Sequence, residues 1–222
     1  MKLWIAIAVT MLAVDGFGEE GAPHEREALP VEKRVAFMSG HVEAGLALYR
    51  AGAPEQASQH LMHPVSETHA SERVGIDALG FDATLFEAVS KALEAGKPAS
   101  ELEPQLKKAE ENTALMQQKA GGDTKDIIKY LMGTVGDEYG VGVEAGKITD
   151  PGEYQDAFGF SVVALKMAGR IEDPKAAVLT TELEALVALW PKGGPLADSI
   201  PTPVAKITAQ TARVLKAMAA LP

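Results

Sequence analysis

"KAGGDTKD", residues 119–126, is the clearest interruption in a chain of 222 residues. Its paired glycines, Gly121 and Gly122, end one helical segment, and Asp123 suits the N-cap of the next. The stretch divides the chain that follows an N-terminal leader into two nearly equal halves. It therefore predicts two helical bundles, over residues 31–120 and 121–222.

Apolar residues recur at three- and four-residue steps on both sides of this break, and no convincing run alternates with a period of two. The fold class predicted is all-α, with about eight antiparallel helices in two four-helix sets. We expect helices over residues 31–50, 54–69, 78–95, 101–119, 124–145, 151–169, 173–190 and 202–220. The turns "RAGAPEQA" (50–57) and "EAGKITDPGE" (144–153) occupy matching places in the two halves, which suggests an internal duplication.

The N-terminus, "MKLWIAIAVTMLAVDGFGEE", has the order of a secretory signal: one lysine, an apolar run, then small residues. The run is about twelve residues, shorter than the roughly 20 that span a bilayer, and no later segment is apolar enough to span one. We expect a signal peptide over residues 1–18, a flexible leader over 19–30, and a periplasmic or secreted protein. An N-terminal anchor that is not cleaved is the alternative.

Composition excludes several classes of function. The net charge of −10 disfavours a nucleic-acid partner, which requires a basic face. The absence of cysteine excludes disulfides, zinc–thiolate sites, iron–sulfur clusters and covalent haem. Any metal must therefore bind through nitrogen and oxygen. No nucleophile elbow, zinc-protease motif or phosphate-binding glycine loop is present, so we do not expect an enzyme.

Histidines crowd one stretch, "QHLMHPVSETH", residues 59–69. On a helix, His60, His63 and Glu67 lie within about 60° of one another, whereas His69 points the opposite way. His41 precedes the turn at Gly52 by as many residues as His63 follows it. An antiparallel hairpin therefore brings these two side chains to one level.

This convergence predicts a metal site formed by His41, His60, His63 and Glu67. Imidazole and carboxylate ligands suit iron, copper, zinc or manganese. Pro64 makes the backbone beside the site irregular, by kinking the helix or by ending it at His63. The alternatives are a hydrogen-bonded core histidine with surface neighbours, a metal-dependent hydrolase, and a bundle that binds haem noncovalently through His41 or His63 with a methionine.

Residues 130–160, "YLMGTVGDEYGVGVEAGKITDPGEYQDAFGF", resemble the extracytoplasmic N-terminal region of bacterial high-affinity iron permeases. The shared elements are an acidic residue before Tyr139, the turn 143–148, Glu153-Tyr154 and Phe158. The permease's membrane helices and its "R-E-x-x-E" motifs are absent.

The predicted exported, cysteine-free helical protein is also similar to imelysin-like periplasmic proteins. Their "G-x-H-x-x-E" motif is approximated by "GHVEAG" (40–45). Both resemblances imply an accessory of iron uptake, with iron as the metal and a membrane iron permease as a partner. A periplasmic interaction module without metal is the other reading.

Overall fold

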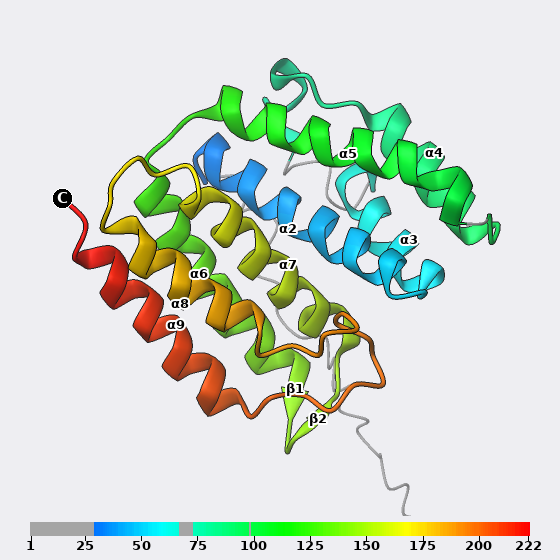
Figure 1. Ribbon diagram of the computed structural model, residues 1–222. Coiled ribbons are helices and arrows are strands. Elements are labelled where there is room, and N and C mark those ends of the chain that lie inside the picture. Colours follow the sequence, from blue (N-terminus) through cyan, green and yellow to red (C-terminus); the bar gives the residue numbers. More distant parts are fainter. Residues whose placement is uncertain (1–28, 67–72, 98) are drawn as a thin grey trace, which may run out of the picture.

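The computed structural model describes residues 29–66, 73–97 and 99–222. Within these residues it confirms the all-α fold class (Figure 1). The α-helices of the described residues are α2 (Val31–Arg50), α3 (Pro54–Met62), α4 (Ala83–Glu94), α5 (Ala99–Ala120), α6 (Thr124–Gly142), α7 (Pro151–Ala168), α8 (Ala176–Val187) and α9 (Val204–Ala219). Between α3 and α4, the described residues form the short 3-10 turns η1 (His63–Val65) and η3 (Asp77–Leu79). The predicted signal peptide and most of the leader lie outside the described residues.

Aspartate side chains cap the starts of α6 and α7, and the cap by Asp123 confirms the sequence prediction. The Asp123 carboxylate accepts the backbone N–H groups of Lys125 and Asp126 at the start of α6. Asp150 does the same for the first turn of α7, which has proline at its first position. These side chains satisfy N–H groups that have no partner within the helix.

The turn between α6 and α7 differs from the prediction. We expected α6 to continue to residue 145, but it ends at Gly142. A small antiparallel hairpin follows, β1 (Val143–Glu144) and β2 (Lys147–Ile148). Its two central residues have positive φ, 49° at Ala145 and 76° at Gly146, which is the backbone of a tight hairpin turn and not of a helix.

The second helix is also shorter than predicted. α3 ends at Met62, and His63 and Pro64 belong to η1. Proline has no N–H for the helical hydrogen bond and crowds the preceding turn, so the α-helix stops here. The remainder of the predicted helix, residues 67–69, lies outside the described residues.

Each half of the chain has its own apolar core, and α2 packs into both. Val42, Leu46 and Leu48 of α2 pack with α3, α4 and α5. Ala36 and Phe37 of the same helix join the large core of the C-terminal half. In Figure 1, α2 and α7 run side by side through the middle of the molecule, with α5 on one side and α8 on the other. The α2–α7 contact therefore joins the two halves.

Glycines allow α2 and α7 to approach closely. A Cβ atom added to Gly159 would lie 2.0 Å from the carbonyl oxygen of Gly40, and one added to Gly40 would lie 2.1 Å from the Phe160 ring. Neither position has room for a side chain, so the backbones pack directly against each other. Among the described residues, no helix combines the length and the apolar character needed to cross a membrane.

Candidate metal centre

Two of the predicted histidines meet an aspartate beside this helix crossing. His41 comes from α2, His60 from α3 and Asp156 from α7. Their exposed fractions are 2%, 6% and 8%, so water reaches none of them freely. Buried groups of this kind must be paired or must bind an ion, because burying an isolated charge is costly. This group is called the HHD cluster below.

The three side chains of the HHD cluster share one carboxylate oxygen. Asp156 Oδ1 lies 2.7 Å from His41 Nδ1 and 2.9 Å from His60 Nδ1. Ligands about 2.1 Å from a metal and at right angles to each other are separated by roughly 3.0 Å. Each residue offers a ligand atom, and these atoms lie within 4.8 Å of one another. The cluster therefore has the donor set of a transition-metal site, and the two separations that involve the carboxylate match neighbouring coordination positions.

Local packing explains why α3 reaches the cluster. A Cβ atom added to Gly45 of α2 would lie 2.8 Å from the Leu61 side chain and 3.3 Å from the Cβ atom of His60. The missing side chain thus lets α3 lie directly on α2, with His60 turned toward His41 and Asp156. The tight turn at Gly52, where φ is 82°, reverses the direction of the chain between α2 and α3.

Both ring nitrogens of His60 face acceptors. Nδ1 contacts Asp156, and Nε2 lies 2.8 Å from the Gln155 amide oxygen. The Gln155 amide nitrogen in turn donates to Gln56, which fixes the orientation of the amide. A ring that donates at both nitrogens is an imidazolium. Burial lowers the pKa of His60, but the Asp156 charge and the hydrogen bonds to Asp156 and Gln155 outweigh it and raise that pKa overall.

The pKa of Asp156 is shifted in the opposite direction to that of His60. Burial by itself raises the pKa of its carboxyl group, but the charges of His41 and His60 and their hydrogen bonds lower that pKa well below its usual range. Without a metal, the cluster is therefore a buried ion pair in which protons lie between the nitrogens and the shared oxygen. A metal that binds there must displace those protons.

His41 retains a nitrogen that the cluster does not use. Its Nε2 is buried and has no hydrogen-bond partner among the described residues. The Phe37 ring meets the His41 ring edge-on at 4.8 Å between centroids. The His63 ring stacks on it at 3.6 Å, with 17° between the planes.

The structure thus separates the four predicted ligands. It brings His41 and His60 together, and it places His63 at the level of His41, as the hairpin argument expected. His63 stacks on the His41 face and does not belong to the HHD cluster. Glu67 lies outside the described residues. Asp156, which supplies the shared oxygen, was missed.

The comparison with protein families concerns the half that contains Asp156. Residues 117–221 match the model of the iron permease-associated 4-helix bundle domain. The C-terminal half of this chain is similar to that domain. This confirms the resemblance of residues 130–160 to iron permeases. No curated protein and no solved structure matched the chain.

The boundaries of the iron permease-associated bundle divide the HHD cluster. Asp156 lies within the matched residues, whereas His41 and His60 precede them. The two histidines therefore reach the bundle from α2, which packs on α7, and from α3, which packs on α2. The match supports a helical protein related to iron uptake, and it does not extend to the helices that carry the two histidines.

Proposed function

We propose that this protein is an exported, non-enzymatic metal-binding accessory of iron uptake. His41, His60 and Asp156 bind one transition-metal ion, which is iron in the cell. The observation that carries the proposal is the shared carboxylate oxygen, which lies 2.7 and 2.9 Å from two buried imidazole nitrogens. The protein holds the ion outside the cytoplasm and passes it to a membrane iron permease.

The donor set supports iron. Two imidazoles and one carboxylate on adjacent positions are the protein ligands of many non-haem Fe(II) sites. The family match adds an iron context to a donor set that copper and zinc would also accept. With three protein ligands, coordination positions remain for other donors, and the unpartnered Nε2 atom of His41 offers a second binding mode through the same ring.

The burial of the cluster supports a binding role. Asp156 and both histidines are almost completely covered, so a bound ion is shielded from bulk water. A carrier benefits from slow exchange, whereas an enzyme needs a path by which substrate reaches the ion. Export is supported by the signal-like order of residues 1–18.

Titration calorimetry of the mature protein with Fe(II), under anaerobic conditions, tests this function. Cu(II) and Zn(II) titrations establish the selectivity. We expect the wild type to bind one ion, and His41→Ala, His60→Ala and Asp156→Asn each to weaken binding at least about 10-fold. Asp137→Asn, an exposed carboxylate on α6, is the matched control and should bind like the wild type.

Two results would reject the metal centre. One is wild-type binding no tighter than about millimolar, or roughly −4 kcal/mol. The other is normal affinity in both histidine variants. Elemental analysis of protein exported to its native compartment identifies the resident metal, and a metal-free product would favour the interaction-module reading.

A further inference from the structure

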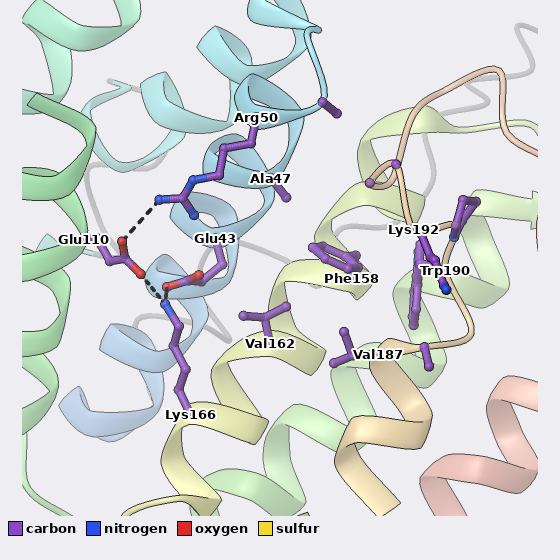
Figure 2. Close-up of a pocket in the computed structure, with 15 residues that line it drawn as sticks. Glu43, Ala47, Arg50, Glu110, Phe158, Val162, Lys166, Val187, Trp190 and Lys192 are labelled. Atoms are coloured by element: carbon purple, nitrogen blue, oxygen red, sulfur yellow. Dashed lines mark hydrogen bonds and ion pairs between the residues drawn. The ribbon is translucent and has the colours of Figure 1, made fainter. Parts of the chain in front are cut away.

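A second candidate binding site is the cleft between the two halves of the molecule, with a volume of about 820 Å³. Figure 2 shows α2 and Glu110 of α5 on one side, and α7 with the segment 187–194 on the other. No residue of the HHD cluster lines it. Glu43 lines the cleft. Because Glu43 lies two residues after His41 on α2, its side chain points about 200° away from that of His41 around the helix axis. Pockets for small organic ligands have volumes of about 300–1,000 Å³ and often lie between such units.

One wall of the cleft is apolar and rigid. Phe158 and Val162 are one turn apart on α7, and Val187 and Trp190 continue the surface (Figure 2). The Trp190 ring meets Phe158 edge-on at 5.8 Å, and its Nε1 donates to the Tyr154 carbonyl oxygen at 3.3 Å. The indole is therefore held in place, and the wall is suited to the flat or apolar body of a ligand.

The opposite wall is charged, and one lysine bridges its two carboxylates. Lys166 Nζ donates to Glu43 at 2.7 Å and to Glu110 at 2.5 Å. Burial raises the pKa of Glu43, although Lys166 opposes that shift. An ammonium group thus occupies the position between the carboxylates that a metal cation would need. This arrangement disfavours a bare cation as the occupant of the cleft.

Two cationic side chains of the cleft retain hydrogen-bonding capacity. Arg50 Nη2 lies 3.5 Å from Glu103 and 3.5 Å from Glu110, and its side chain is 49% exposed. A guanidinium has five N–H donors, and these long contacts use few of them. Lys192 is exposed and forms no ion pair within the described part of the chain. Among the side chains that line the cleft, the three cationic ones outnumber the two carboxylates, so the lining has a net positive charge.

We propose that this cleft binds a small organic anion, in which a carboxylate or sulfonate is attached to an apolar or aromatic body. The body lies against Phe158, Val162 and Val187, and the anionic group accepts hydrogen bonds from Arg50 and Lys192. A planar oxyanion matches the fork of donors on arginine, which a chloride or a neutral polar group does not. The proposal does not depend on the metal centre.

Fluorescence titration with 8-anilino-1-naphthalenesulfonate tests the cleft directly, because Trp190 reports on its own wall. The chain has two tryptophans, and Trp4 lies in the predicted signal peptide, so Trp190 is the only source of indole emission in the mature protein. N-phenyl-1-naphthylamine is the matched probe, with the same rings and no sulfonate. All titrations contain a chelator, so that metal binding does not contribute.

We expect energy transfer from Trp190 to the sulfonate probe and saturable binding. Arg50→Gln combined with Lys192→Gln should weaken the sulfonate about tenfold, the size expected for charged hydrogen bonds, and leave the neutral probe unchanged. Lys147→Gln combined with Lys206→Gln, at exposed lysines on β2 and α9, is the control for the same change in net charge.

The proposal is overturned if the wild type shows no transfer from Trp190. It is also overturned if the double variant binds the sulfonate as tightly as the wild type, or if its affinities for the two probes fall by the same factor. Displacement of the bound sulfonate by 1-naphthoate, but not by 1-naphthalenemethanol, extends the result from sulfonates to carboxylates. Equal displacement by both compounds contradicts recognition of the anion.

Discussion

Replacing Asp156 by asparagine removes the charge from the HHD cluster and keeps the size of the side chain. In the wild type, one carboxylate oxygen accepts hydrogen bonds from His41 and His60, and His60 is the protonated partner. In the variant, the uncharged amide oxygen serves both donors, and its NH₂ group acquires no obvious acceptor. The imidazolium of His60 is then buried without a counter-charge.

The structure sets the size of the effect. Removing one partner of a buried ion pair costs about 3–5 kcal/mol, since the other charge stays desolvated. Asparagine keeps one acceptor, so we expect a loss of about 3 kcal/mol in the free energy of unfolding when His60 is charged. Asp156 raises the pKa of His60, so this contribution is complete below the unfolded value of 6.5 and is lost as pH rises through the raised pKa. Well above that pKa, the loss should fall to about 1 kcal/mol.

Urea denaturation of metal-free protein, followed by far-ultraviolet circular dichroism at about pH 5.5 and about pH 9, measures both values. Asp137→Asn is the control for a loss of one exposed carboxylate and should change stability by less than about 0.5 kcal/mol. An equal loss for Asp156→Asn at the two pH values would refute the reasoning, because a packing defect does not depend on the charge of His60.

Three further predictions concern the helix crossing, the caps and the metal. Gly159→Ala should cost at least about 1–3 kcal/mol by urea denaturation, because its Cβ atom meets the Gly40 carbonyl, whereas Gly133→Ala, with open space around it, should be neutral or stabilising by up to about 1 kcal/mol. Asp150→Ala should cost about 1 kcal/mol by removing the cap of α7, and Asp150→Ser should recover most of it in the same assay. Fe(II) affinity should weaken as pH falls through the raised pKa of His60, because the metal displaces that proton, and calorimetry in buffers of different ionisation enthalpy should detect proton release.

The sequence predicted the helices well because their signals are local. Aspartate caps, paired glycines and apolar periodicity act within a few residues, and α6 and α7 begin where those signals place them. The errors are local too. Pro64 ended α3 sooner than the apolar pattern suggested, and Ala145 adopted a left-handed turn that few residues other than glycine favour.

The metal centre was only half predictable. His41 and His60 meet through a hairpin of short loop length, which helix geometry can anticipate. Asp156 is 115 residues from His41, and only the packing of α7 on α2 brings them together. The nearest signal in the sequence was the resemblance of residues 130–160, a segment that contains Asp156 although Asp156 is not one of the shared elements. The glycines that permit the contact, Gly40 and Gly159, look like ordinary helical glycines in the sequence.

The metal binding proposed for the HHD cluster would be coupled to the packing of the two halves. The histidines belong to α2 and α3, the aspartate belongs to the iron permease-associated bundle, and the crossing of α2 with α7 sets their separation. An ion held by all three residues must therefore stabilise the contact between the halves, by about 2.7 kcal/mol when its free concentration is a hundred times the Kd. Conversely, any change that loosens the Gly40–Gly159 contact should weaken the affinity for the metal without altering a ligand. Gly159→Ala is thus expected to lower both stability and metal affinity, whereas a simple loss of fold stability, as in Asp150→Ala, should leave the affinity of the folded protein intact.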